Sequence, residues 1–287
     1  RVLLRELTFS NPGLSCDRLL FVKRFTQQTY ADINVNHHAW GSKPGGDICI
    51  LDGIRDLASP ERMSSWPEAK PILAGQLGPG NVHGIDLHWD AGRVLFAYSR
   101  NPSGVPPEGW LARQSSYDIH RSIDLLHLYE VNIDGSGLRQ LTDGQWSDLN
   151  PCYLPSEDIV FESERCGFSL QCNEYDKDEP TTNLYTMRPD GSGIRRLAVT
   201  KDGDWYPRVH SDGSLIYSHW EYHERSLMFL HPLWTVRPDG TGEDAFVKQH
   251  FNYPVALTAP RPIPDSRKVI AVATGHHTLA AGPIVIV

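Results

Sequence analysis

The chain has 287 residues, 40% of them hydrophobic, which is enough to bury a sizeable core in one repeat domain or in two ordinary domains. Its net charge is −8 and it contains no dense run of Lys and Arg, which argues against binding to nucleic acid or to an anionic membrane surface. The longest apolar runs have the length of strands, so no membrane-spanning helix is expected. No signal peptide is visible, and because the chain opens at Arg1 we expect a processed or truncated product.

Strand-like runs recur along the whole chain, and the 24 Gly and 21 Pro residues between them favour many short strands over helices. We divide these runs into five units, of which the first is degenerate. The last unit ends on a strand-like run without a partner after it. The predicted units cover residues 14–54, 84–144, 147–203, 204–251 and 254–287.

Two hairpins make up each complete unit. The first hairpin, strands A and B, is formed by the strand-like runs within 87–98, 151–161, 207–218 and 262–272. The second hairpin, strands C and D, has an Asp-Gly-Ser/Thr-Gly turn that begins at Asp134, Asp190 and Asp239. Asp-Gly between two strand-like runs predicts a tight hairpin, because Gly accepts the positive φ that the turn requires.

Four strands in a period of roughly fifty residues are typical of a β-propeller. We therefore predict an all-β protein, a β-propeller of four-stranded antiparallel blades with at least five blades, which forms part of a six- or seven-bladed ring. A closed ring leaves no sheet edge open. A chain that stops within a blade is thus expected to be a piece of a longer protein, or to be closed by a strand from its first residues.

The long loops are expected at one end of the propeller. In a four-stranded meander, the A–B and C–D turns lie on one face, and the B–C loops and the links between blades lie on the other. Loops on a rigid scaffold are where binding and catalysis concentrate, and most of the 13 histidines fall in the B–C loops. These loops are predicted at residues 24–46, 99–126, 163–182, 218–232 and 274–282.

Histidines of the B–C loops are candidate ligands for a divalent metal, which we expect to be Zn, Mn or Ca. The His-x-x-x-His spacing of His219 and His223 holds one metal only on a helix, whereas a loop is expected here. An acidic run at 174–179 is a further candidate for calcium, although it lacks the ligand pattern of an EF-hand. The candidate metal ligands are His37, His38, His219, His223, His276 and His277.

Cysteines provide an alternative metal set, formed by Cys152, Cys166 and Cys172. Cys166 and Cys172 share one loop, so they could instead close a short disulfide. Cys152 follows a proline at the start of an innermost strand, where a buried and inert thiol is the default. No Cys-x-x-Cys-His motif occurs, so no covalent haem is expected in this chain.

Arginines and aromatic residues near the same face are candidates for ligand binding, because Arg pairs with carboxylates and aromatic rings offer stacking surfaces. Trp205, on a link between blades, has closure of the core between blades as its alternative role. No nucleophile elbow or P-loop occurs, and no catalytic residue can be named. The candidate ligand-binding residues are Arg165, Trp205, Trp220, Arg225 and Tyr98.

Several segments resemble the repeats of TolB-type propellers, among them 141–144, 150–155 and 183–193. A closer resemblance, to the middle propeller domain of the hydrazine synthase alpha subunit, is carried by residues 20–24, 161–166, 217–222, 233–242 and 273–277. This resemblance implies a periplasmic or secreted protein, joined to other domains or subunits of a larger exported protein. In hydrazine synthase the haems belong to a separate domain, so the resemblance implies a scaffold without its own haem.

Our first functional hypothesis is an exported propeller module that binds a partner domain or a ligand on its B–C loop face. The alternative is a metal-dependent carbohydrate-active enzyme similar to a polysaccharide lyase, which uses the histidines of that face. In such an enzyme the metal neutralises a uronate carboxylate while a His or Lys takes the adjacent proton. Whether the chain is an enzyme stays open at this point.

Overall fold

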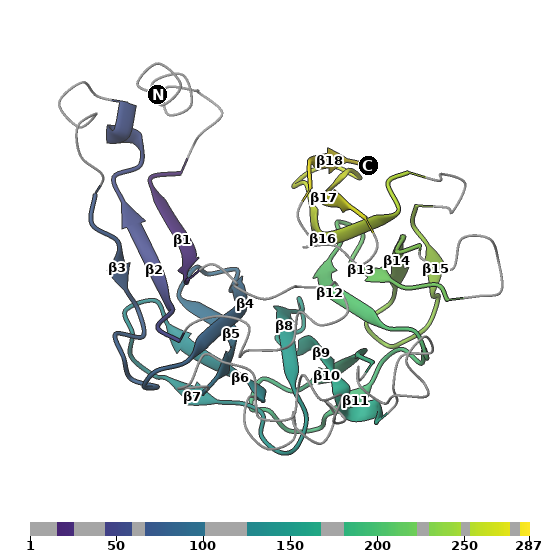
Figure 1. Cartoon of the computed structure of the whole chain (residues 1–287), viewed down its shortest axis with the longest axis horizontal. Coiled ribbons are helices and arrows are strands. Elements are labelled where there is room, and N and C mark those ends of the chain that lie inside the picture. Colours follow the sequence, from purple (N-terminus) through teal and green to yellow (C-terminus); the bar gives the residue numbers. More distant parts are fainter. Residues whose placement is uncertain are drawn as a thin grey trace, which may run out of the picture.

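Five antiparallel sheets follow one another along the chain and are arranged around a common axis (Figure 1). The computed structural model describes residues 16–25, 44–58, 67–100, 125–167, 181–222, 230–247, 253–275 and 282–287. The first and the last sheet lie at the two ends of an arc in Figure 1. This arrangement confirms the predicted all-β propeller of antiparallel blades.

Three of the sheets have four strands and two have three. The first sheet comprises β1 (Arg18–Lys23), β2 (Asp47–Asp52) and β3 (Lys70–Pro71), and the second β4 (Asn81–Leu87), β5 (Arg93–Ser99), β6 (Leu126–Asn132) and β7 (Arg139–Gln140). The third comprises β8 (Asp148–Tyr153), β9 (Ile159–Ser163), β10 (Asn183–Met187) and β11 (Arg195–Arg196), and the fourth β12 (Asp204–Val209), β13 (Leu215–His219), β14 (Leu233–Val236) and β15 (Asp244–Ala245). The fifth comprises β16 (Ala256–Pro262), β17 (Val269–Thr274) and β18 (Ile284–Ile286).

Two short 3-10 helices, η3 (Arg55–Ala58) and η6 (Glu164–Cys166), follow strands of the first and third sheets. Among the described residues, we find no helix with the length and hydropathy of a membrane span. The strand β3 lies outside the range 14–54 that we predicted for the first unit, and β4 begins ahead of residue 84. The segment between β2 and β3 contains no Asp-Gly-Ser/Thr-Gly turn, so no local signal marked the third strand of this sheet.

Inner strands β4, β8, β12 and β16 lie side by side along the axis, and each carries a bulge at the same place. The register of each inner strand shifts against its neighbour there. The bulge residues have positive φ, namely 49° at Gly84, 44° at Asn150, 58° at Tyr206 and 51° at Ala259. A bulge adds one residue to one strand and re-aims the side chains that follow it.

The Asp-Gly turns also join neighbouring blades. A Cβ atom on Gly191 would lie 2.3 Å from the carbonyl oxygen of Leu141, at the end of the preceding sheet. A Cβ atom on Gly240 would lie 2.8 Å from the corresponding carbonyl of Leu197. Beside the Asp190-Gly191 turn, Arg139 donates from Nη2 to the carbonyl oxygen of Pro189 over 3.0 Å. The turn motif therefore specifies both the hairpin and its packing on the previous blade.

The hydrophobic core is divided into layers between successive sheets. Phe96 and Tyr129 of the second sheet pack towards the first, and their rings stack with a centroid distance of 5.6 Å. Leu95 of the second sheet and Phe161 of the third share the next layer, and both side chains are fully buried. Successive residues of β5 thus pack into two different layers, because their side chains point to opposite faces of the sheet.

Candidate functional site

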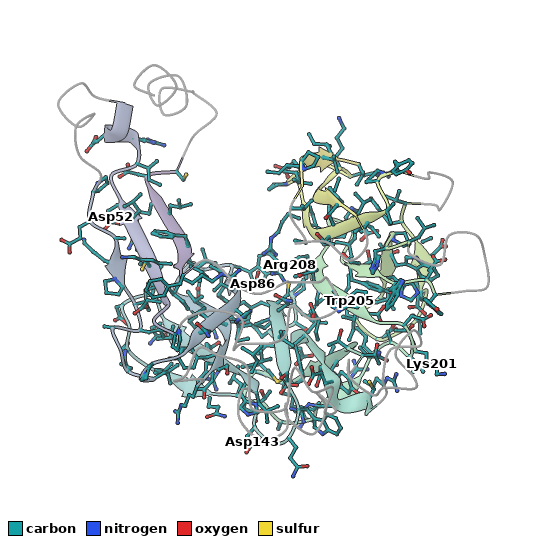
Figure 2. The ribbon with its side chains drawn as sticks, viewed as in Figure 1. Asp52, Asp86, Asp143, Lys201, Trp205 and Arg208 are labelled. Carbon is teal, nitrogen blue, oxygen red and sulfur yellow. The ribbon has the colours of Figure 1, made fainter. Side chains whose placement is uncertain are left out.

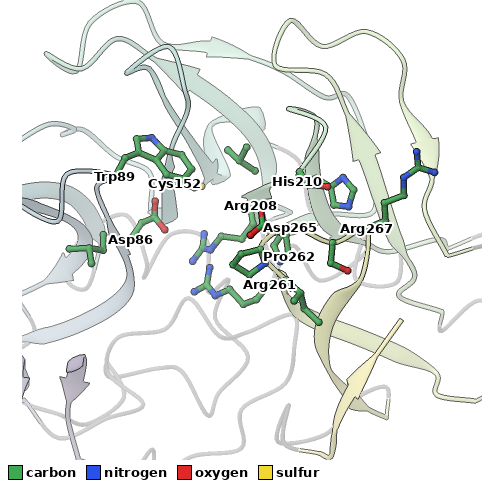
Figure 3. A pocket seen from close by; sticks show the side chains of 15 residues that line it. Asp86, Trp89, Cys152, Arg208, His210, Arg261, Pro262, Asp265 and Arg267 are labelled. Atoms are coloured by element: carbon green, nitrogen blue, oxygen red, sulfur yellow. The ribbon is translucent and has the colours of Figure 1, made fainter. Parts of the chain in front are cut away.

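A cavity of about 780 Å³ opens on the propeller axis, where the inner strands β4, β8, β12 and β16 end (Figure 3). We call it the axial pocket. Its lining comes from the last residues of these strands and from the A–B turns that follow them. It therefore lies at the end of the A–B turns, opposite the B–C loop face.

Equivalent positions of the four inner strands contribute to this pocket. Each of these residues comes two positions after a bulge residue with positive φ, so the bulge sets the direction of its side chain. Figure 3 shows all four side chains around the same space. These residues are Asp86, Cys152, Arg208 and Arg261.

Arg208 occupies the centre of this set and is only 6% exposed. Its Nη1 donates to the carbonyl oxygen of Pro207 over 2.6 Å, and more weakly to those of Asn150 and Pro151 at 3.5 and 3.4 Å. Its Nε atom is buried and has no hydrogen-bond acceptor among the described residues. A guanidinium charge held mainly by neutral carbonyl groups is unusual, because buried charges are normally paired with an opposite charge.

Asp86 and Cys152 face Arg208 across the pocket. Burial raises the pKa of Asp86, and the charge of Arg208 and a 2.9 Å hydrogen bond from the Tyr153 backbone N–H oppose this only in part. Burial, together with the negative charge of Asp86, raises the pKa of Cys152 to about 12. Cys152 is therefore a thiol at neutral pH, the inert state expected by default for a buried cysteine.

The rim of the pocket combines charge with apolar surface. Arg261, Arg267 and Asp265 come from the fifth sheet and its A–B turn. Trp89, in the A–B turn of the second sheet, is 62% exposed. His210 is held by Asp212, whose Oδ1 lies 3.1 Å from Nδ1.

The candidate residues at the B–C end make contacts within and between blades. Arg165 forms a 2.6 Å ion pair with the buried Asp148. His219 forms a 2.7 Å pair with the buried Asp204. Tyr98 is 3% exposed and donates from its hydroxyl to the carbonyl oxygen of Gly78 over 2.7 Å.

Trp205 and Trp220 form one aromatic cluster with His231. The centroid distance is 6.3 Å between the two indoles, and 5.5 and 5.3 Å from Trp205 and Trp220 to the imidazole. All three side chains are at most 2% exposed. Trp205 lies in β12 and not on a link between blades, and the cluster that buries it is formed by residues of the fourth blade.

Several candidate residues fall outside the described part of the chain: Arg225, His37, His38, His223, His276, His277 and Cys172. Cys166 is described, and its Sγ donates to the carbonyl oxygen of Thr181 over 3.3 Å. Within the described ranges, no group of three or more His, Cys, Asp and Glu side chains is placed to hold a metal ion. A divalent metal therefore stays a prediction from the sequence.

The axial pocket was not predicted from the sequence, although a signal for it exists. Each of Cys152, Arg208 and Arg261 directly follows a proline, in Pro151-Cys152, Pro207-Arg208 and Pro260-Arg261. Alignment of the inner strands on this proline would have brought the two arginines to one level of the propeller.

No known family model matches this chain, and no curated protein matches its sequence. Among solved structures, hydrazine synthase of Kuenenia stuttgartiensis is similar, with a TM-score of 0.65 and 16% identity over 94% of this chain and 37% of that one. TolB from Acinetobacter baumannii is similar with a TM-score of 0.53 and 11% identity, over 99% of this chain and 56% of that one. A manganese-bound oligogalacturonate lyase gives 0.50 and 12% identity, over 79% of this chain and 53% of that one.

The chain has a TolB-like β-propeller fold. At identities of 11–16% these likenesses show the fold alone. The chain spans 37% of the hydrazine synthase chain and 56% of the TolB chain, so it corresponds to part of each. The resemblances to TolB-type repeats and to hydrazine synthase are thus supported as a TolB-like propeller fold and not as membership of a specific family.

Proposed function

We propose that this chain is a binding module, which receives a small ligand or a short segment of a partner in its axial pocket. One observation carries the proposal: four equivalent positions of the inner strands converge on one cavity with the polar side chains Asp86, Cys152, Arg208 and Arg261. In Figure 2, Asp86 and Arg208 lie near the centre of the arc that the sheets form.

The dimensions of the pocket support this function. A volume of about 780 Å³ lies within the usual range of roughly 300–1,000 Å³ for small-molecule sites. Its floor is built on strands, whose ladder hydrogen bonds and bulges fix the side chains before a ligand arrives. Such preorganisation reduces the ordering entropy that binding must overcome.

The other functional predictions remain proposals beside this one. A partner domain docking on the B–C loop face is supported by the length of those loops in the sequence. Export to the periplasm or beyond is supported by the resemblance to hydrazine synthase and by the TolB-like fold. The metal-dependent carbohydrate-active enzyme rests on histidines of which His219 alone is described, and His219 is engaged with Asp204.

A crystallographic fragment screen with neutral and charged compounds tests the binding function. We expect fragments to collect in the axial pocket. A Ser211→Trp variant should remove them, because the new indole would fill the pocket from an exposed turn position without disturbing the core. Val199→Trp is the matched control, because Val199 is 80% exposed and does not line the pocket. Fragments that collect elsewhere, with an empty axial pocket, would contradict the proposal.

A further inference from the structure

We infer that the axial pocket is an oxyanion site, in which Arg208 and Arg261 hold one carboxylate or phosphate group of a small ligand whose ring-shaped or apolar body packs against Trp89. This inference rests on the proposed function and names the chemistry of its ligand. We base it on the incomplete pairing of Arg208, the position of Arg261, the net charge of the pocket lining and the apolar side chains at the rim.

Arg208 is incompletely paired. No carboxylate of the described residues lies within ion-pair distance of its guanidinium group. Its Nε atom is buried without an acceptor in the same part of the chain. A buried charge without a direct ion pair is unfavourable. An anion in the pocket would supply that ion pair through the exposed part of the guanidinium group.

Arg261 brings a second guanidinium group to the axial pocket. It occupies the place in β16 that Arg208 occupies in β12, and Figure 3 shows the two guanidinium ends pointing into the same space. Two positive charges so placed repel each other unless an anion lies between them. A guanidinium group offers a planar fork of N–H donors that matches the two oxygens of a carboxylate or phosphate. The two arginines are therefore placed to bind an oxyanion between them.

The lining of the axial pocket has a positive net charge. The lining contains three arginines, Arg208, Arg261 and Arg267, and two acids, Asp86 and Asp265, so it carries one excess positive charge when both acids are ionised. Burial raises the pKa of Asp86, and protonation of this carboxyl increases the excess. One excess positive charge suits one oxyanion and disfavours a polyanion.

The rim of the axial pocket is partly apolar. Trp89 is 62% exposed and Leu87 is 40% exposed, and both line the pocket. Pro262 and Ile263 line it from the fifth sheet. A large aromatic side chain left in solvent beside a polar floor favours a ligand with a flat apolar body. The ligand is thus amphipathic, with its anionic group towards the floor and its body towards the rim.

Calorimetric titration with simple probes tests this chemistry. Benzoate and phenyl phosphate combine a ring with an oxyanion, acetate and inorganic phosphate lack the ring, and benzamide is the neutral counterpart of benzoate. We expect benzoate or phenyl phosphate to bind once per chain, at least tenfold more tightly than benzamide and than the probe without the ring. Their order distinguishes a carboxylate ligand from a phosphate ligand. Binding should weaken as salt is added.

Variants assign the binding to the arginines. Arg261→Gln should weaken the better probe at least tenfold, and because Arg261 is exposed this change should leave the fold intact. Arg208→Gln should weaken it further, with thermal unfolding as the check on its stability. Arg188→Gln is the matched control, an exposed arginine outside the pocket lining, and should change nothing.

Two results would overturn the inference. If benzamide binds as tightly as benzoate and Arg261→Gln has no effect, the pocket takes neutral ligands, and the proposed binding function stands without the oxyanion. If no anionic probe binds at millimolar concentration while neutral fragments occupy the axial pocket, the oxyanion site is likewise rejected. An axial pocket that stays empty in the fragment screen would instead reject the proposed function itself.

Discussion

His219 and Asp204 form a buried pair at the B–C end of the fourth sheet, with Nδ1 2.7 Å from the carboxylate oxygen Oδ1. The third sheet has a related arrangement, in which the Ser163 hydroxyl donates to Asp148 over 2.6 Å. In both blades, an acidic residue at the start of the inner strand is thus hydrogen-bonded to the last residue of the next strand. The fourth blade differs in using a side chain that titrates near neutral pH.

The pair makes stability depend on pH. Burial alone lowers the pKa of His219, but the hydrogen bond and charge of Asp204 outweigh it and raise the pKa above its usual value. A histidine whose pKa is raised by folding stabilises the protein below its unfolded pKa of about 6.5, and this contribution is lost as pH rises through the higher folded value. His219→Gln should therefore destabilise the protein most at about pH 5.5, by about 3 kcal/mol, and less at pH 8.5.

Urea unfolding at the two pH values measures this difference. Ser218→Ala is the control, because Ser218 donates to the carbonyl oxygen of Leu257 over 2.8 Å and neither group titrates in this range. It should lose about 1 kcal/mol at both pH values. An equal loss for His219→Gln at both pH values would contradict the charged pair.

Glu162 should give the chain a second pH dependence. Its Oε1 accepts hydrogen bonds from the Asn150 side chain over 2.8 Å and from the Tyr206 backbone N–H, and burial raises its pKa to about 8. Because the folded protein holds this proton more tightly than the unfolded chain, stability falls as pH rises from about 4.5 to 8. Glu162→Gln keeps an acceptor and carries no charge, so it should be more stable than the wild type at pH 8, on the order of 2 kcal/mol.

Denaturation curves of the Glu162→Gln variant between pH 5 and 8 check this expectation. The advantage of the variant should shrink towards pH 5, where the wild-type carboxyl is protonated. Glu68→Gln, at an exposed position, serves as the control and should follow the wild-type curve. A constant difference across the pH range would show that the charge of Glu162 is not responsible.

A pair of glycines separates turn geometry from packing between blades. Gly191 and Gly213 have nearly the same φ, 86° and 84°. A Cβ atom on Gly191 would meet the Leu141 carbonyl oxygen at 2.3 Å, whereas one on Gly213 would meet nothing within 4 Å. Gly213→Ala should thus cost about 1 kcal/mol from φ alone, and Gly191→Ala about 3 kcal/mol, because the blades must also move apart. Equal losses in thermal unfolding would mean that the turn does not depend on the neighbouring blade.

Local signals explain which parts of the fold the sequence predicts. The Asp-Gly turns at Asp134, Asp190 and Asp239 are hairpin signals within a few residues, and all three hairpins are found. Strand β3 pairs with β2 over only two residues across a long connection, so it has no such signal. Pairing across long connections depends on the rest of the sheet rather than on the local sequence.

Bulges explain why the candidate site was harder to predict. Alternation along a strand identifies the side chains of one face only while the register holds. In β12 the register shifts between Trp205 and Arg208. Trp205 belongs to the buried aromatic cluster of the fourth blade, whereas Arg208 lines the axial pocket, and no periodic pattern in the sequence marks that change.

Arg165 has two candidate roles. The sequence analysis names it as a ligand-binding residue, whereas the structure pairs it with Asp148. Its Nη2 and Nε lie 2.6 and 3.2 Å from the two carboxylate oxygens, and the Asp148 side chain is fully buried. Removal of one partner of a buried ion pair leaves an uncompensated charge, so Arg165→Met should destabilise the protein by about 3–5 kcal/mol.

The double variant Asp148→Asn with Arg165→Met decides between the two roles. Without a charge at residue 148, the loss of Arg165 no longer leaves a buried carboxylate unpaired. The double variant should therefore recover much of the stability that the single variant loses. Thermal unfolding of the two variants and the wild type measures the recovery. If Arg165→Met unfolds at the wild-type temperature, the ion pair does not stabilise the blade, and ligand binding becomes the better account of Arg165.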